Sequence, residues 1–149
     1  MESQNNMDQA GDAPVADIGS EDGLPETGYA PVNGLDMYYE IHGAGGTPLL
    51  LLHGGLFNID LQFGEVLPTL AKSRNVIAVD FQAHGRTGDI DRPLTSAHLA
   101  SDVEGLLGHL EIRQVDMFGI RVGARWLSPG DRATTARTEA NRLFRSVSS

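Results

Sequence analysis

Two glycines four positions apart, Gly119 and Gly123, flank the position in this chain where a reactive side chain would be expected. They follow Val115–Phe118, a stretch that predicts a short strand. In the motif G-x-S-x-G, a strand turns sharply into a helix and exposes the middle side chain at the top of a sheet. The middle residue here is Arg121. Because a guanidinium stays protonated, it cannot serve as a nucleophile.

Two further apolar runs end in polar residues, at positions where a sheet would bind a ligand. Residues 48–53 end in His53, and residues 75–80 end in Asp80. Continuous apolar runs are expected of strands that are covered on both faces of a parallel sheet. Because ligands of open α/β sheets bind beyond the carboxyl ends of the strands, we expect His53, Asp80 and Gly119 to meet at one edge.

The first elements of the chain are predicted to be a hairpin and a helix. Tyr29–Val32 and Leu35–His42 have strand-like patterns on either side of Asn33-Gly34, a strong turn signal. Ile59–Ser73 is a candidate helix, although Pro68 lies inside it.

A second helix is expected where Thr95 or Ser96 can act as an N-cap. Its apolar residues recur at helical spacing, at Leu99, Val103, Leu106 and Leu110. The predicted order is two hairpin strands followed by strands that alternate with helices. That order indicates an α/β fold with an open, mostly parallel sheet.

Three ordered motifs between Gly28 and Gly123 resemble the N-terminal half of the α/β-hydrolase family, of the serine esterase and lactonase type. Residues 50–55 (LLLHGG) resemble its His-Gly oxyanion segment, residues 80–87 (DFQAHGRT) its D-x-x-x-H-G-x-[ST] loop, and residues 119–123 its nucleophile elbow. The resemblance implies a partial hydrolase sheet without its C-terminal strands. It also implies hydrolysis of ester, lactone or amide-like bonds through a serine acyl-enzyme, a small ester-like substrate, and no cofactor or metal ion.

The resemblance also implies roles for single residues. The backbone amides of Gly55 or Leu56 and of Val122 would form an oxyanion hole, which stabilises charge that develops on a substrate carbonyl. Arg121 takes the nucleophile position. The remaining motif residues are expected to be structural, with the two imidazoles bracing loops and the carboxylate accepting backbone amides: His53, Gly54, Asp80, His84, Gly85, Gly119 and Gly123.

The catalytic triad is incomplete in this sequence. In this fold the nucleophile is followed along the chain by an acid and then by a histidine, but all five histidines precede the elbow. Loss of the nucleophile alone costs on the order of a millionfold in rate in a comparable triad enzyme. We therefore expect an inactive chain. The alternatives are a non-catalytic remnant that binds a ligand or partner, and an active enzyme with an unusual site.

Composition limits the kind of partner. The chain has 149 residues, no cysteine and a net charge of −9, which argues against nucleic acid and anionic membrane surfaces. It has neither an apolar run long enough to span a membrane nor a signal-peptide pattern, so a cytoplasmic location is expected. Residues 1–27 contain seven acids and no Lys or Arg, which is typical of a disordered leader. The hydrolase-like domain is expected over residues 28–123.

The Arg-rich residues 124–149 do not continue the hydrolase pattern. One hypothesis is a reading-frame slip, because deleting one G from GC-rich codons for Val-Gly-Gly-Ala-Val-Ala-Leu gives the sequence of Val122–Leu127. The coding DNA tests this hypothesis, which is wrong if neither other frame downstream encodes hydrolase-like strands, an aspartate and a histidine. The alternative is a true helix over Thr134–Phe144. In either case the elbow strand would have one unpaired edge, through which the chain could self-associate.

Overall fold

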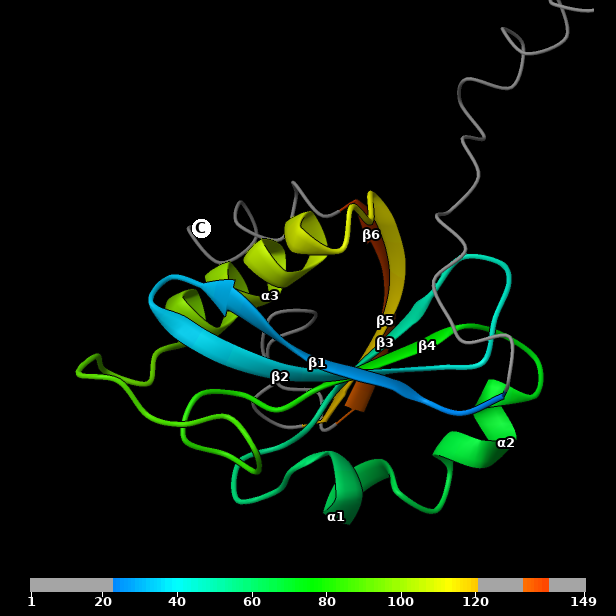
Figure 1. The fold of residues 1–149 in the computed structure, drawn as a ribbon, viewed down its shortest axis with the longest axis horizontal. Coiled ribbons are helices and arrows are strands. Elements are labelled where there is room, and N and C mark those ends of the chain that lie inside the picture. Colours follow the sequence, from blue (N-terminus) through cyan, green and yellow to red (C-terminus); the bar gives the residue numbers. More distant parts are fainter. Residues whose placement is uncertain (1–22, 121–132, 140–149) are drawn as a thin grey trace, which may run out of the picture.

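The described residues of the computed structural model, 23–120 and 133–139, form one mixed sheet with helices on both faces (Figure 1). The sheet has six strands in the order β1-β2-β4-β3-β5-β6. The strands are β1 (Glu26–Val32), β2 (Leu35–His42), β3 (Leu49–Leu52), β4 (Val76–Val79), β5 (Gln114–Ile120) and β6 (Ala133–Glu139). The helices are α1 (Ile59–Phe63), α2 (Leu67–Ala71) and α3 (Ser96–His109).

The predicted hairpin is confirmed. β1 pairs with β2 in antiparallel register up to Val32 opposite Leu35. Asn33 and Gly34 form the turn with φ angles of 52° and 80°, the left-handed conformation that a two-residue hairpin turn requires. β1 starts at Glu26, so the last residues of the expected leader belong to the sheet.

The predicted parallel centre of the sheet is also confirmed. β3 pairs in parallel with β4 on one side and with β5 on the other. Its four leucines are all buried, because α3 covers one face of the sheet and α1 with α2 covers the other (Figure 1). The two faces therefore form two separate apolar clusters, as expected for a sheet buried on both sides.

α3 follows the predicted pattern closely. The side chain of Thr95 caps the helix by accepting a hydrogen bond from the His98 amide at 3.1 Å. Leu99, Val103 and Leu106 are buried against the sheet. α3 is the longest described helix at 14 residues, and none of the described helices is long and apolar enough to cross a membrane.

The single helix expected over Ile59–Ser73 is wrong. The chain forms two five-residue helices, α1 and α2, with a break at residues 64–66. Pro68 lies in the first turn of α2. Proline has no amide hydrogen and its ring clashes with the preceding helical turn, so α1 cannot continue through it, whereas a new helix can begin there.

The expectation that β5 has an unpaired edge is also wrong. β6 pairs with β5 in antiparallel register from Gln114 opposite Glu139 to Ile120 opposite Ala133. The helix proposed over Thr134–Phe144 is therefore a strand as far as Glu139, and its remaining residues lie outside the described part. Pairing with β5 satisfies the backbone N–H and C=O groups of both strands. This gain is larger than the weak helical preference of the segment.

Candidate functional site

The ends of three neighbouring parallel strands bring the sequence motifs together at one edge of the sheet. Leu52, the last residue of β3, lies opposite Val79 of β4 and Gly119 of β5. His53 and Asp80 directly follow those two strand ends. This is the carboxyl edge at which open α/β sheets bind their ligands.

His53 is completely buried and both of its ring nitrogens contact the backbone. Nδ1 lies 2.7 Å from the Gly54 carbonyl oxygen, to which it can only donate. Nε2 accepts a hydrogen bond from the Phe81 amide at 3.0 Å. The ring is therefore neutral, and it links the turn after β3 to the loop after β4.

The environment of His53 makes a pH dependence of stability expected. Burial lowers the pKa of His53 below its ordinary value of 6.5, while the bond to the Gly54 carbonyl opposes this shift. Since the unfolded chain binds this proton at higher pH than the folded chain, stability falls as the pH drops through about 6.5 towards the folded-state pKa.

Urea unfolding at several pH values measures this effect, with His53→Gln as the comparison. The variant should lose part of the decrease in the free energy of unfolding below pH 7. Parallel pH curves for the two proteins would contradict the assignment, because the other four histidines, His42, His84, His98 and His109, are common to both.

Asp80 holds two loops through its side chain. Its carboxylate oxygens accept hydrogen bonds from the amides of Ile59 at 2.9 Å and Arg86 at 3.0 Å. Gly85 lies against the carboxylate with φ +54°, and a Cβ at this position would collide with it. The Asp-x-x-x-His-Gly motif therefore combines one buried carboxylate with a glycine that lets the backbone approach it.

His84 and Thr87 complete the loop. Nδ1 of His84 donates to the Gln82 carbonyl at 2.8 Å, and its ring centroid lies 5.1 Å from that of His53. The hydroxyl of Thr87 donates to the Asp80 carbonyl at 2.7 Å and accepts from the Tyr38 amide at 2.9 Å. Both side chains are used within the fold.

The turn Gly54–Leu56 has fewer hydrogen bonds within the protein than the loop residues around it. The Gly54 amide donates to the side chain of Gln62 at 3.3 Å. Leu56 has a φ of 67°, a conformation that is uncommon for a residue with a side chain, and its side chain is 91% exposed. Among the described residues, neither the Gly55 amide nor the Leu56 amide has a hydrogen-bond acceptor.

Only the first residues of the predicted nucleophile elbow are among the described residues. β5 continues through Gly119 to Ile120, the residue before the predicted nucleophile position. Arg121, Val122 and Gly123 lie outside the described residues, so their roles stay predictions. Within residues 23–120 and 133–139, no group of three or more His, Asp or Glu side chains could hold a metal ion.

Several positioning residues were not predicted from the sequence. Gln62 supports the turn after β3, and Asn58 caps α1 by accepting from the Leu61 amide at 2.9 Å. An asparagine directly before an apolar run is an N-cap signal, so Asn58 could have been found. Arg92 and Asp102, which form a buried ion pair, carry no such local signal.

Comparisons with known proteins find relatives that are similar to part of this chain. Over 95 residues the chain is 38% identical to the dihydrolipoyllysine-residue acetyltransferase component of the acetoin cleaving system of Pseudomonas putida. The aligned region covers 58% of this chain and 23% of that protein. Over 93 residues it is 36% identical to the soluble epoxide hydrolase of Corynebacterium sp. (strain C12). This aligned region covers 60% of this chain and 31% of that protein. No family model matches the chain.

Solved structures extend the comparison to the fold. The crystal structure of epoxide hydrolase VrEH1 from Vigna radiata matches with a TM-score of 0.63 at 25% identity, over 74% of this chain and 35% of that one. The sheet order and the helices on both faces are those of an α/β fold. The described residues form part of an α/β-hydrolase fold. The chain spans less than a third of the length of each of the two curated relatives.

Proposed function

We propose that this chain keeps the carbonyl-binding part of an α/β-hydrolase site and performs no hydrolysis. The turn Gly54–Leu56 is the observation that carries the proposal. Two adjacent amides at the carboxyl edge have no acceptor among the described residues, while the backbone around them is bonded to His53 and Gln62. Fixed, unpaired donors of this kind are what an oxyanion or a polarised carbonyl requires.

The absence of hydrolysis follows from Arg121. In the alignment of motifs it takes the place of the serine, directly after the end of β5. Its guanidinium has no basic lone pair at neutral pH, so it cannot form an acyl-enzyme. The ligands that fit this site are small molecules with an ester, lactone or amide carbonyl, or the carboxylate of such an acid.

Two measurements test the proposal separately. Hydrolysis of p-nitrophenyl butyrate should stay at the buffer rate for the full chain and also for Arg121→Ala. Turnover by the unmodified chain that the substitution abolishes would overturn the claim of inactivity. Such a result would make Arg121 part of an unforeseen catalytic site.

Binding is followed by NMR on the ¹⁵N-labelled chain during titration with butyramide and with butyrate. We expect the amide resonances of Gly55 and Leu56 to shift, with saturation. The amide of Gly108, an exposed residue in the last turn of α3, serves as the internal control. Shifts of equal size at Gly108, or none at the two loop amides, would contradict the proposed site.

A further inference from the structure

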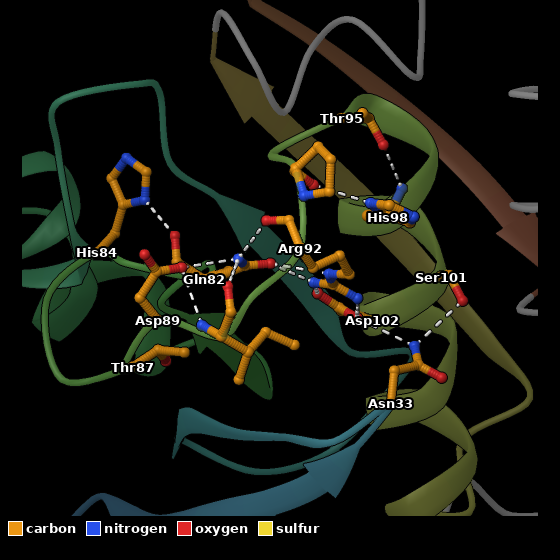
Figure 2. A network of polar contacts seen from close by, with 12 residues as sticks. Asn33, Gln82, His84, Thr87, Asp89, Arg92, Thr95, His98, Ser101 and Asp102 are labelled. Atoms are coloured by element: carbon orange, nitrogen blue, oxygen red, sulfur yellow. Dashed lines mark hydrogen bonds and ion pairs between the residues drawn. The ribbon is translucent and has the colours of Figure 1, made fainter.

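A buried ion pair anchors the loop between β4 and α3 to α3 itself, because Arg92 lies in the loop and Asp102 in the helix (Figure 2). Arg92 donates from Nη1 to Oδ1 of Asp102 at 2.9 Å and from Nη2 to Oδ2 at 2.6 Å. The two side chains are 14% and 1% exposed. Such a two-pronged contact fixes the orientation of a guanidinium as well as its position.

The same guanidinium holds a second side chain, that of Gln82. Nε and Nη2 of Arg92 both donate to its carbonyl oxygen, at 2.9 and 2.5 Å. The amide nitrogen of Gln82 contacts three acceptors, the Asp89 carboxylate at 2.8 Å and the carbonyls of Ile90 and Arg92 at 3.2 and 3.0 Å. Gln82 is completely buried, so these contacts define its place within the loop (Figure 2).

Gln82 lies next in the chain to the residue that binds His53. The Phe81 amide donates to Nε2 of His53 at 3.0 Å, and Nδ1 of His53 donates to the Gly54 carbonyl at 2.7 Å. A continuous path therefore runs from Arg92 through Gln82 and Phe81 to His53, and from there to the turn Gly54–Leu56. Every step of this path is a hydrogen bond or a peptide bond.

Stability alone is a weak reason for this arrangement. Replacing a buried ion pair by apolar side chains of similar volume is often neutral or stabilising. The hydrogen bonds to Gln82 are directional, so they fix one position of the backbone at residues 81–82. Apolar packing is not directional and would not do this.

We propose that Arg92 is a positioning residue that acts through Gln82 and Phe81. It holds the ring of His53, which we call the His53 brace, in contact with the turn Gly54–Leu56. An effect of Arg92 on ligand affinity rests on the function proposed above. An effect of Arg92 on the position of His53 does not, and it can be measured without any ligand.

Two variants break the path at different points. Arg92→Lys keeps a charge beside Asp102, but a compact ammonium lacks the planar fork that also reaches Gln82. Gln82→Met leaves the ion pair intact and removes the side-chain contacts of Gln82. Asn33→Gly is the matched control, since Asn33 contacts Asp102 from the hairpin side at 3.0 Å and glycine tolerates the φ of 52° at this turn.

The first measurement is the hydrogen-exchange rate of the Phe81 amide, compared with the rate of the Ile77 amide in the middle of β4. The second is the ¹⁵N chemical shifts of the His53 ring. Loss of the brace should speed exchange at Phe81 about tenfold in both variants, as expected for a local opening, and should change the His53 shifts. Asn33→Gly should change neither.

Equal acceleration at Phe81 and Ile77 would show a general loss of stability and would overturn the proposal, as would unchanged exchange at Phe81. Butyramide titration then adds a separate arm. If the unmodified chain binds and the variants bind about tenfold more weakly, the brace supports the ligand site. If the unmodified chain does not bind, the proposed function fails, while the exchange data still decide the role of Arg92.

Discussion

Replacing Asp80 with alanine is expected to destabilise the chain by about 4 kcal/mol, because the change leaves two backbone amides without an acceptor. Those amides belong to Ile59 and Arg86, and the carboxylate is 1% exposed. The free energy of unfolding in urea measures the loss. Because native domains are stable by only about 5–15 kcal/mol, this substitution should remove between about a quarter and four fifths of the free energy of unfolding.

Asp80→Asn and Asp36→Ala are the comparisons. Asparagine keeps one acceptor oxygen, so its cost should fall between those of the unmodified chain and the alanine variant. Asp36 is exposed on β2, and its replacement should change stability by no more than about 0.5 kcal/mol. Equal effects of Asp80→Ala and Asp36→Ala would contradict the role given to the buried carboxylate.

Replacing Phe81 with alanine should cost about 3–5 kcal/mol, since it removes a large buried ring and leaves a cavity. The ring is 1% exposed, and its centroid lies 4.6 Å from that of His53. The cavity would open directly beside the imidazole, so His53 should also lose its fixed orientation. The midpoint of thermal unfolding and the ¹⁵N shifts of His53 report these two effects.

Leu61→Ala is the matched control for Phe81→Ala. Leu61 is 70% exposed on α1, so losing its side chain creates no cavity. A decrease in the thermal midpoint that is similar for both variants would mean that the aromatic ring is not part of the tightly packed interior.

Much of the sheet could be predicted because its signals are local. Asn33-Gly34 specifies a hairpin through backbone conformation alone, and four consecutive leucines of β3 indicate a strand covered on both faces. The stripe on α3 follows the helical period from a threonine cap. His53, Asp80 and Gly119 converge for a topological reason, because the carboxyl ends of parallel strands lie at the same edge.

The remaining features depend on partners that are distant in the sequence. β6 forms because β5 offers it a ladder, and its own residues carry only a weak helical pattern. The contact between Arg92 and Asp102 joins a loop to a helix, and no spacing rule relates the two residues. The break between α1 and α2 was visible in Pro68, but the sequence did not show whether proline would kink one helix or begin another.

The parallel centre of the sheet has a consequence for biosynthesis. β3 pairs with β5 through residues as far apart as Leu49 and Asp116, whereas the β1–β2 hairpin can close within about 1–10 μs of emerging. At about 5–20 residues per second, the ribosome needs several seconds to advance from β3 to the end of β5. Until β5 is complete, the four leucines of the nascent chain lack at least one of their two neighbouring strands, so this apolar strand is open to association with other chains.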